Sequence, residues 1–212
     1  MILHGYYRSS ASFRVRIALN LKGISYESTP WHLREGAHLD ASFAAINPHQ
    51  LIPVLDDEGT LLTQSLAIIE YLDETHPAPP FLPTGAANRA YVRGLAQSIA
   101  CDIHPIDNLR VLKYLRTNFE ADEAAVGSWY NHWIATGFVG VEATLANDVR
   151  TGSFCFGETP GLADILLVPQ VVNAANYKLD MTPYPVIRRI FDTCMALPTF
   201  KNAHPRTQAD AE

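Results

Sequence analysis

The feature that most constrains this chain is its opening run, residues 2–16, where an apolar, strand-like start changes directly into an amphipathic helical pattern. Three hydroxyl groups, on Ser9, Ser10 and Ser12, stand at the junction. A strand that leads straight into a helix leaves the first helical N–H groups unpaired, and these amides with the helix dipole favour an anion. Because serine can cap such a terminus or hydrogen-bond an oxyanion or thiolate, the run predicts either a plain N-cap or an anion site.

Size and composition exclude several classes of protein. A length of 212 residues indicates one large domain or two small ones, and the 48% hydrophobic and 18% charged content are typical of a soluble globular chain. A net charge of −6 without a basic cluster argues against nucleic-acid binding. No apolar run reaches ~18 residues and no secretory signal is recognisable, so neither a membrane span nor export is expected. The 3 cysteines are widely spaced, which fits free thiols in a reducing cytoplasm.

The first eighty residues predict a small mixed sheet. Residues 24–30 are strand-like, residues 39–46 fit a short helix, and residues 54–55 and 61–62 form two strands around an acidic turn. Ser65 then begins an amphipathic helix. This order predicts a βαβ unit joined to a ββα unit, with two helix N-termini at one edge of the sheet. Two such termini make an anion-binding edge.

Two further features stand at that edge. Gln64 and Ser65 place a second set of helix-start donors at a strand end, although a plain serine cap explains Ser65 equally well. Pro53 opens the first hairpin strand, and a cis Ile52–Pro53 bond would turn the backbone of Ile52 towards a ligand.

Residues 75–85 contain four prolines, a composition that stops a helix and stiffens a connection. We therefore predict a first domain of residues 1–83 and a second of residues 84–212. Helical patterns cover residues 88–118 and 121–147, begin again near Leu162, and end with 185–197, so the second domain is expected to be an all-helical bundle.

The unusual segment of the helical half is 101–110. It gathers Asp102, His104, Asn108 and Arg110 around Pro105, which is expected to interrupt the helix. Such a segment is either a cleft wall or a solvated kink. Further along, Asp164 lies three residues after Gly161 and is expected to accept from its amide, as half of a capping box.

Several chemistries lack their motifs. The sequence has no GxSxG elbow, P-loop, GxGxxG or HExxH, and its 8 histidines show no metal-ligand spacing, so no metal is expected. A Ser-His-Asp hydrolase stays open, although nothing in the sequence orders such a triad.

Four stretches together carry a resemblance that covers nearly the whole chain. They are residues 8–16 (RSSASFRVR), Asn47-Pro48 with Ile52-Pro53, residues 64–72 (QSLAIIEYL), and residues 101–110. In this order and spacing the chain resembles the zeta class of cytosolic glutathione transferases, and within it the bacterial maleylacetoacetate and maleylpyruvate isomerases. The resemblance implies an α/β thioredoxin-like N-terminal domain, an all-α C-terminal helical bundle, a cytoplasmic homodimer, and glutathione as cofactor.

The resemblance also implies roles for particular residues. Ser9 would lie near the glutathione sulfur, with Ser10 and Ala11 at the same helix start, while Ile52 would pair with the cysteinyl main chain and Pro53 would be cis. Asp102 would reach the tripeptide of a neighbouring subunit. The remaining positions implied to contact glutathione are His38, Gln64, Ser65, His104, Asn108, Leu109 and Arg110.

The expected reaction is glutathione-dependent cis–trans isomerisation of a maleyl diketo acid, a dicarboxylate, to its fumaryl isomer in the catabolism of aromatic compounds. Ser9 and the amides of Ser10 and Ala11 would stabilise the thiolate, and Arg8 and Arg110 would orient the substrate's carboxylates. The alternatives are a general transferase or dehalogenase acting on small α-halo acids, and a glutathione-binding protein without turnover.

Three positions depart from the family pattern. Ala11 replaces a frequent cysteine, which excludes chemistry by a protein thiol at that position. Gly161 replaces the usual Ser or Thr cap, at a cost of about a few tenths of a kcal/mol. Asn176 stands where maleylpyruvate-type enzymes can carry an arginine for a substrate carboxylate, which weakens the assignment to maleylpyruvate.

Overall fold

A computed structural model describes residues 1–212. The chain forms two compact units, the first made of Met1–Pro80 with Met195–Glu212 and the second of Phe81–Cys194. No helix combines the length and apolar character that crossing a membrane requires.

The first unit is built on a four-stranded sheet in the order β2-β1-β3-β4. Its strands are β1 (Ile2–Gly5), β2 (Glu27–Pro30), β3 (Val54–Asp57) and β4 (Thr60–Thr63). β1 pairs with β2 in parallel, whereas β3 pairs with β1 and with β4 in antiparallel fashion. The predicted mixed sheet and its hairpin are therefore confirmed, and the two units match the predicted fold class.

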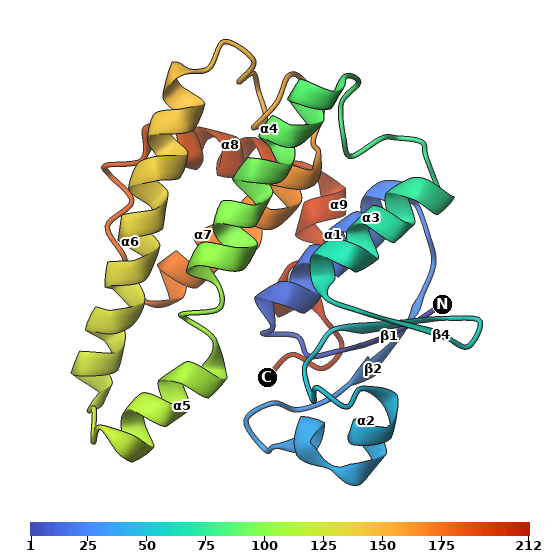
Figure 1. Cartoon of the computed structure of the whole chain (residues 1–212), viewed down its shortest axis with the longest axis vertical. Coiled ribbons are helices and arrows are strands. Elements are labelled where there is room, and N and C mark those ends of the chain that lie inside the picture. Colours follow the sequence, from blue (N-terminus) through green and yellow to red (C-terminus); the bar gives the residue numbers. More distant parts are fainter. The chain divides into compact units, whose positions relative to one another are not determined.

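Helices cover both faces of this sheet. Helices α1 (Ser10–Lys22) and α3 (Ser65–Thr75) pack side by side on one face, and α2 (Ala41–Ile46) lies on the other (Figure 1). Apolar side chains from all three, such as Leu19, Ile68 and Phe43, are fully buried. Gly23 ends α1 at φ 66°, in the left-handed conformation that glycine adopts without strain. This packing fixes α1 and α3 so that both begin at a strand end.

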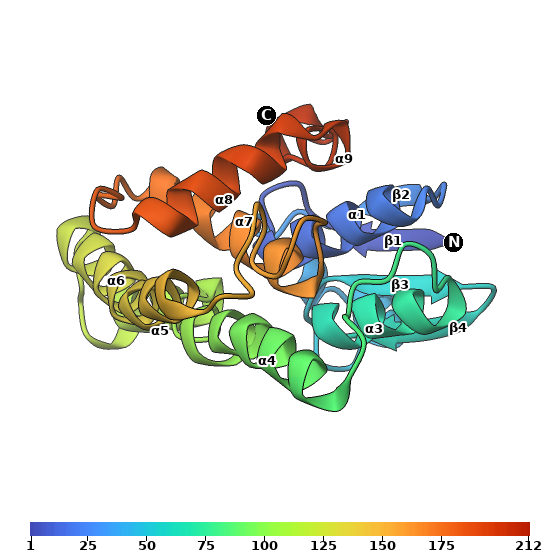
Figure 2. The same cartoon turned by 90° about the horizontal axis from the view of Figure 1, so that it is seen from above.

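The last segment of the chain belongs to the first unit. The short helix α9 (Pro198–Lys201) packs against α1 (Figure 2), and Asn20 Nδ2 donates to the carbonyl of Thr199 at 2.9 Å. The sequence pattern had placed these residues in the helical domain, because a short helix carries no sign of the distant surface on which it packs. The boundary between residues 83 and 84 itself stays a prediction.

The second unit is entirely helical, as predicted. Its helices are α4 (Ala86–Gln97), a π-helical turn (Ser98–Ile103), α5 (Leu109–Asn118), α6 (Glu123–Asn147), α7 (Leu162–Asn176) and α8 (Pro185–Ala196). α7 packs against both α4 and α6 and is buried from Leu162 to Val171. The expected interruption at Pro105 is present, since turns separate the π-helical turn from α5.

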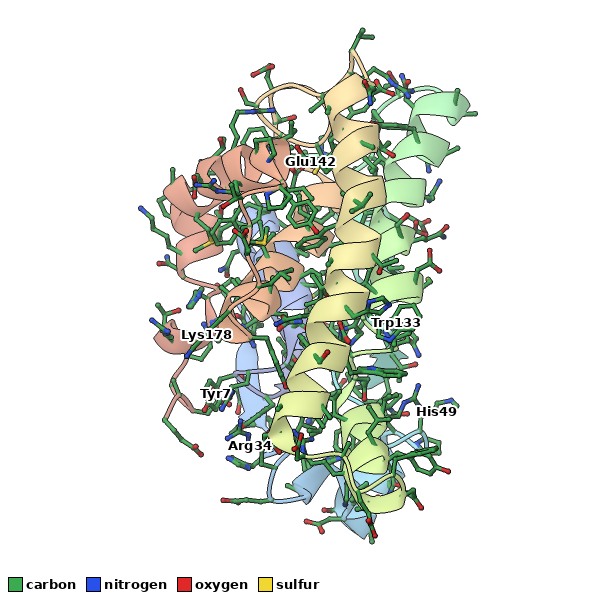
Figure 3. All side chains as sticks on the ribbon, turned by 90° about the vertical axis from the view of Figure 1, so that its left-hand side faces the viewer. Tyr7, Arg34, His49, Trp133, Glu142 and Lys178 are labelled. Carbon is green, nitrogen blue, oxygen red and sulfur yellow. The ribbon has the colours of Figure 1, made fainter.

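Carboxylates hold two helix starts in this unit. Asp164 Oδ2 accepts from the Gly161 amide at 2.9 Å, which confirms the predicted half of a capping box. Glu142 on α6 accepts from the amides of Val186 and Ile187, both at 2.9 Å, at the start of α8 (Figure 3). A Cβ on Gly161 would lie 2.8 Å from the carbonyl oxygen of Phe81, so a serine cap would require the backbone to move. Glycine here is thus a consequence of close packing.

Candidate active site

The serine-rich junction lies at the start of α1. Ser9 is the N-cap, and its Oγ accepts from the amide of Ser12 at 3.1 Å. Capping uses a lone pair of the hydroxyl, so the O–H proton can still be donated to an anion. The two interpretations of Ser9, a cap and an anion ligand, are therefore compatible. Ser10 and Ala11 are buried in the first turn of the helix, which is where amides lack intrahelical acceptors.

Arg8 lies in the turn that leads into this helix. The turn is closed by a hydrogen bond from the Ser9 amide to the carbonyl of Tyr6 at 3.0 Å. The side chain of Arg8 is exposed, whereas Tyr6 and Tyr7 are buried. An exposed guanidinium one residue before the cap is suited to meet a carboxylate that approaches the helix start.

The second helix start, at α3, contains an arginine that the motif analysis missed. Arg14 Nη1 on α1 donates to Ser65 Oγ at 3.3 Å, and the Arg14 side chain is only 1% exposed. A buried cation thus lies beside the helix start expected to bind a carboxylate, and it connects that start to α1. The signal was a charged residue inside the apolar pattern of residues 13–19.

Gln64 precedes Ser65 in an unusual conformation. It is exposed and has a φ of 70°, a region in which residues other than glycine are strained by about 1–3 kcal/mol. Such outliers are concentrated at ligand sites. The strain therefore supports the expected binding role of Gln64.

Ile52 and His38 complete the predicted residues of the first unit. The Ile52–Pro53 bond is cis, as expected. The start of β3 pairs with the end of β1, since Val54 lies opposite His4, so Ile52 is at the same sheet edge as the serine junction. His38 is half-buried in the turn Ala37–Leu39.

The other predicted residues belong to the second unit. Asp102, Leu109 and Arg110 are exposed, and His104 and Asn108 are half-buried. Asn108 caps α5, with Oδ1 accepting from the Arg110 amide at 3.1 Å. The structure thus gathers five of them on one short segment around the turns before α5. Asn176 stands apart, exposed at the end of α7.

The cysteines offer little nucleophilic character. Cys155 and Cys194 are buried, and burial raises the pKa of both thiols, with Asp164 adding to the effect. Cys101 is exposed and no cysteine stands at the α1 start, where the chain has Ala11. A thiolate at this helix start would therefore have to come from a bound ligand.

A second residue that the motif analysis missed is Asp107. It is 5% exposed, and neither carboxyl oxygen has a hydrogen-bond partner. Burial raises its pKa to about 8. Tyr130 is close enough that Asp107 contributes to its raised pKa, and its ring stacks on Tyr177 at 3.7 Å between centroids. Asp107 is thus a neutral acid at moderate pH, next to the cap of α5.

This carboxyl makes stability depend on pH. Between about pH 4 and about pH 8 the folded chain holds a proton that the unfolded chain has released, so the free energy of unfolding falls as pH rises, by up to about 1.4 kcal/mol per pH unit. Asp107→Asn should flatten this slope, because the amide does not ionise. Urea unfolding of both proteins across this range measures the difference. The exposed Asp192→Asn serves as the control that keeps the slope, and parallel curves for wild type and Asp107→Asn would contradict a raised pKa.

Comparisons with known proteins agree with one another. The family described as "Glutathione S-transferase, N-terminal domain" matches residues 3–80. Maleylpyruvate isomerase of Ralstonia is 49% identical over 211 residues, 100% of both chains. Probable maleylacetoacetate isomerase of Vibrio cholerae is 50% identical over 213 residues, 100% of this chain and 98% of the relative.

Solved structures give the same picture. The holo structure of a maleylpyruvate isomerase, a bacterial zeta-class glutathione S-transferase, has a TM-score of 0.99 at 49% identity and covers 100% of both chains. Maleylacetoacetate isomerase of Methylobacterium extorquens, with malonate and glutathione bound, has a TM-score of 0.97 at 39% identity, again over 100% of both chains.

Proposed function

Because the chain belongs to the zeta-class glutathione transferases, we propose that it is a glutathione-dependent isomerase that converts a maleyl diketo acid, maleylacetoacetate or maleylpyruvate, to its fumaryl isomer. The observation that carries the proposal is the start of α1, where Ser9 caps the helix and keeps its hydroxyl proton for a bound anion. Full-length relatives with these names support the choice of reaction. The role is a step in the catabolism of aromatic compounds.

The first unit fits glutathione at two places. The helix start at α1 suits a thiolate, because amides and a hydroxyl lower the pKa of a thiol that they solvate. The helix start at α3, with Ser65 and the buried Arg14 guanidinium, suits a carboxylate. When bound, glutathione supplies a thiol whose ionised form adds reversibly to a conjugated cis double bond and so permits rotation.

The chain's own groups would lower the barrier in two ways. Ser9 and the adjoining amides hold the sulfur as an anion at neutral pH, and donors near the reacting carbonyl stabilise the enolate charge that develops. Arg8 orients a substrate carboxylate through its exposed guanidinium. The Methylobacterium extorquens relative was solved with malonate as well as glutathione, which supports a small dicarboxylate as substrate.

We also propose roles for the residues of the second unit from the family pattern. His104, Asn108, Leu109 and Arg110 contact glutathione, with Arg110 shared between cofactor and substrate. Asp102 reaches the tripeptide bound by the other subunit of a cytoplasmic homodimer. Asn176 bears on the choice between the two substrates, since it offers an amide in place of a guanidinium.

The test is to mix the purified protein with maleylpyruvate and with maleylacetoacetate, each with and without glutathione, and to follow the enol absorbance and identify the product. Loss of the signal only with glutathione, with the fumaryl isomer as product, supports the proposal, and the ratio of kcat/KM values gives the preferred substrate. Turnover of α-halo acids without isomerisation would favour the dehalogenase instead. Glutathione binding without any turnover would indicate a binding protein.

A further inference from the structure

The turn before Ser9 is held by the last residues of the chain. Asp210 Oδ2 accepts from the amide of Tyr7 at 3.0 Å, across 203 positions of sequence. Figure 3 shows Tyr7 in this turn, which lies between β1 and α1. Since Tyr7 is only 7% exposed, its amide would be left buried without an acceptor if this carboxylate were removed.

A buried arginine fastens the same turn from the other side. Arg16 Nη2 donates to the carbonyl of Tyr7 at 3.0 Å, Nη1 donates to that of Tyr6 at 3.5 Å, and Nε donates to that of Ala203 at 2.9 Å. Burial lowers the pKa of Arg16 to about 10, while Tyr26 and Asp210 oppose the shift. The guanidinium therefore stays cationic at neutral pH and attracts the Asp210 carboxylate.

A third contact, farther from the cap, is weaker. Glu212 Oε1 lies 2.7 Å from His32 Nε2, and the same nitrogen lies 3.2 Å from the Tyr6 hydroxyl. The Glu212 side chain is 63% exposed, so this pair contributes little. Among the acidic residues of this segment, Asp210 thus makes the direct contact with the turn backbone.

We propose that Asp210 is a positioning residue for the Ser9 helix start: it fixes the backbone of Tyr7, and through it the places of the Ser9 hydroxyl and the first amides of α1. This inference rests on the proposed function. Donors to an anion act only when they are held close to its position, and small displacements are costly. A turn that loses its acceptor can shift by a fraction of an ångström without unfolding the unit.

The test compares Asp210→Ala with Asp210→Asn, which keeps an acceptor oxygen, and with the exposed Asp192→Ala as control. The pKa of the bound glutathione thiol, followed by the ultraviolet absorbance of the thiolate, and the separate kcat and KM values are the readouts. We expect Asp210→Ala to raise the thiol pKa and to lower kcat by about tenfold. The expected KM change is smaller, Asp210→Asn should restore most of kcat, and Asp192→Ala should match wild type.

Two outcomes would overturn the inference. One is a wild-type thiol pKa and kcat in Asp210→Ala. The other is a loss of thermal stability or glutathione affinity with an unchanged thiol pKa, which would make Asp210 a purely structural residue. The thiol titration needs only glutathione, so it still reports on Asp210 if the wild-type protein turns out not to isomerise maleyl acids.

Discussion

Replacing Asp164 by alanine will lower the free energy of unfolding by about 3–5 kcal/mol. The Asp164 carboxylate is 1% exposed and accepts from the amides of Cys155 at 2.8 Å and Gly161 at 2.9 Å. Burial raises its pKa, and these hydrogen bonds oppose the shift. Alanine removes the cap of α7 and leaves two amides without acceptors, each costing about 1–3 kcal/mol.

Urea unfolding followed by circular dichroism measures this loss. Asp164→Asn keeps one acceptor oxygen of the same shape and should lose about half as much stability. Because a loss of this size is a large part of the stability of a typical domain, the asparagine variant keeps the comparison measurable if the alanine variant does not fold. A change below about 1 kcal/mol in Asp164→Ala would show that the buried carboxylate does not hold this helix start.

The second large effect is on turnover. Ser9→Ala should lower kcat by about 10²-fold, the size of effect seen when one donor to a developing anion is removed. It should also raise the pKa of the bound glutathione thiol, because the hydroxyl that donates to the sulfur is gone. Stability should fall by only about 1 kcal/mol, through loss of the cap to the Ser12 amide.

A matched control separates these two consequences. Asp122 caps α6 by accepting from the Ala125 amide at 2.8 Å, so Asp122→Ala loses a cap of the same kind away from the α1 start. It should lose comparable stability and keep kcat, whereas Ser9→Thr should keep both. Full turnover in Ser9→Ala would move the thiolate role to Ser10 or to the helix amides.

Local signals in the sequence predicted what depends on local structure. The turn at Asp57–Glu58, the serine at the start of α3 and the interruption at Pro105 each follow from the preferences of a few neighbouring residues, and each is present in the structure. The positions of individual candidate residues came from family motifs rather than from periodicity. Their roles in binding and turnover stay predictions.

Contacts between distant residues were beyond reach. Arg16 joins a carbonyl 187 positions away, and Arg14 joins a serine 51 positions away, because helices and strands far apart in the chain pack together. Hydrophobic periodicity gives no information on such pairs. The two arginines looked like ordinary charges within an apolar helix, and only the packing of α1 shows that both are buried.

The packing of residues 195–212 on the first unit bears on how the protein is made. Synthesis runs from the N-terminus, so β1 to β4 and α3 emerge long before α9 and Asp210 do. Until then Arg16 and the Tyr7 amide lack their partners from this segment. The thioredoxin-like unit can therefore collapse early on the ribosome, but its serine turn reaches its final hydrogen bonding only after the helical unit has been translated.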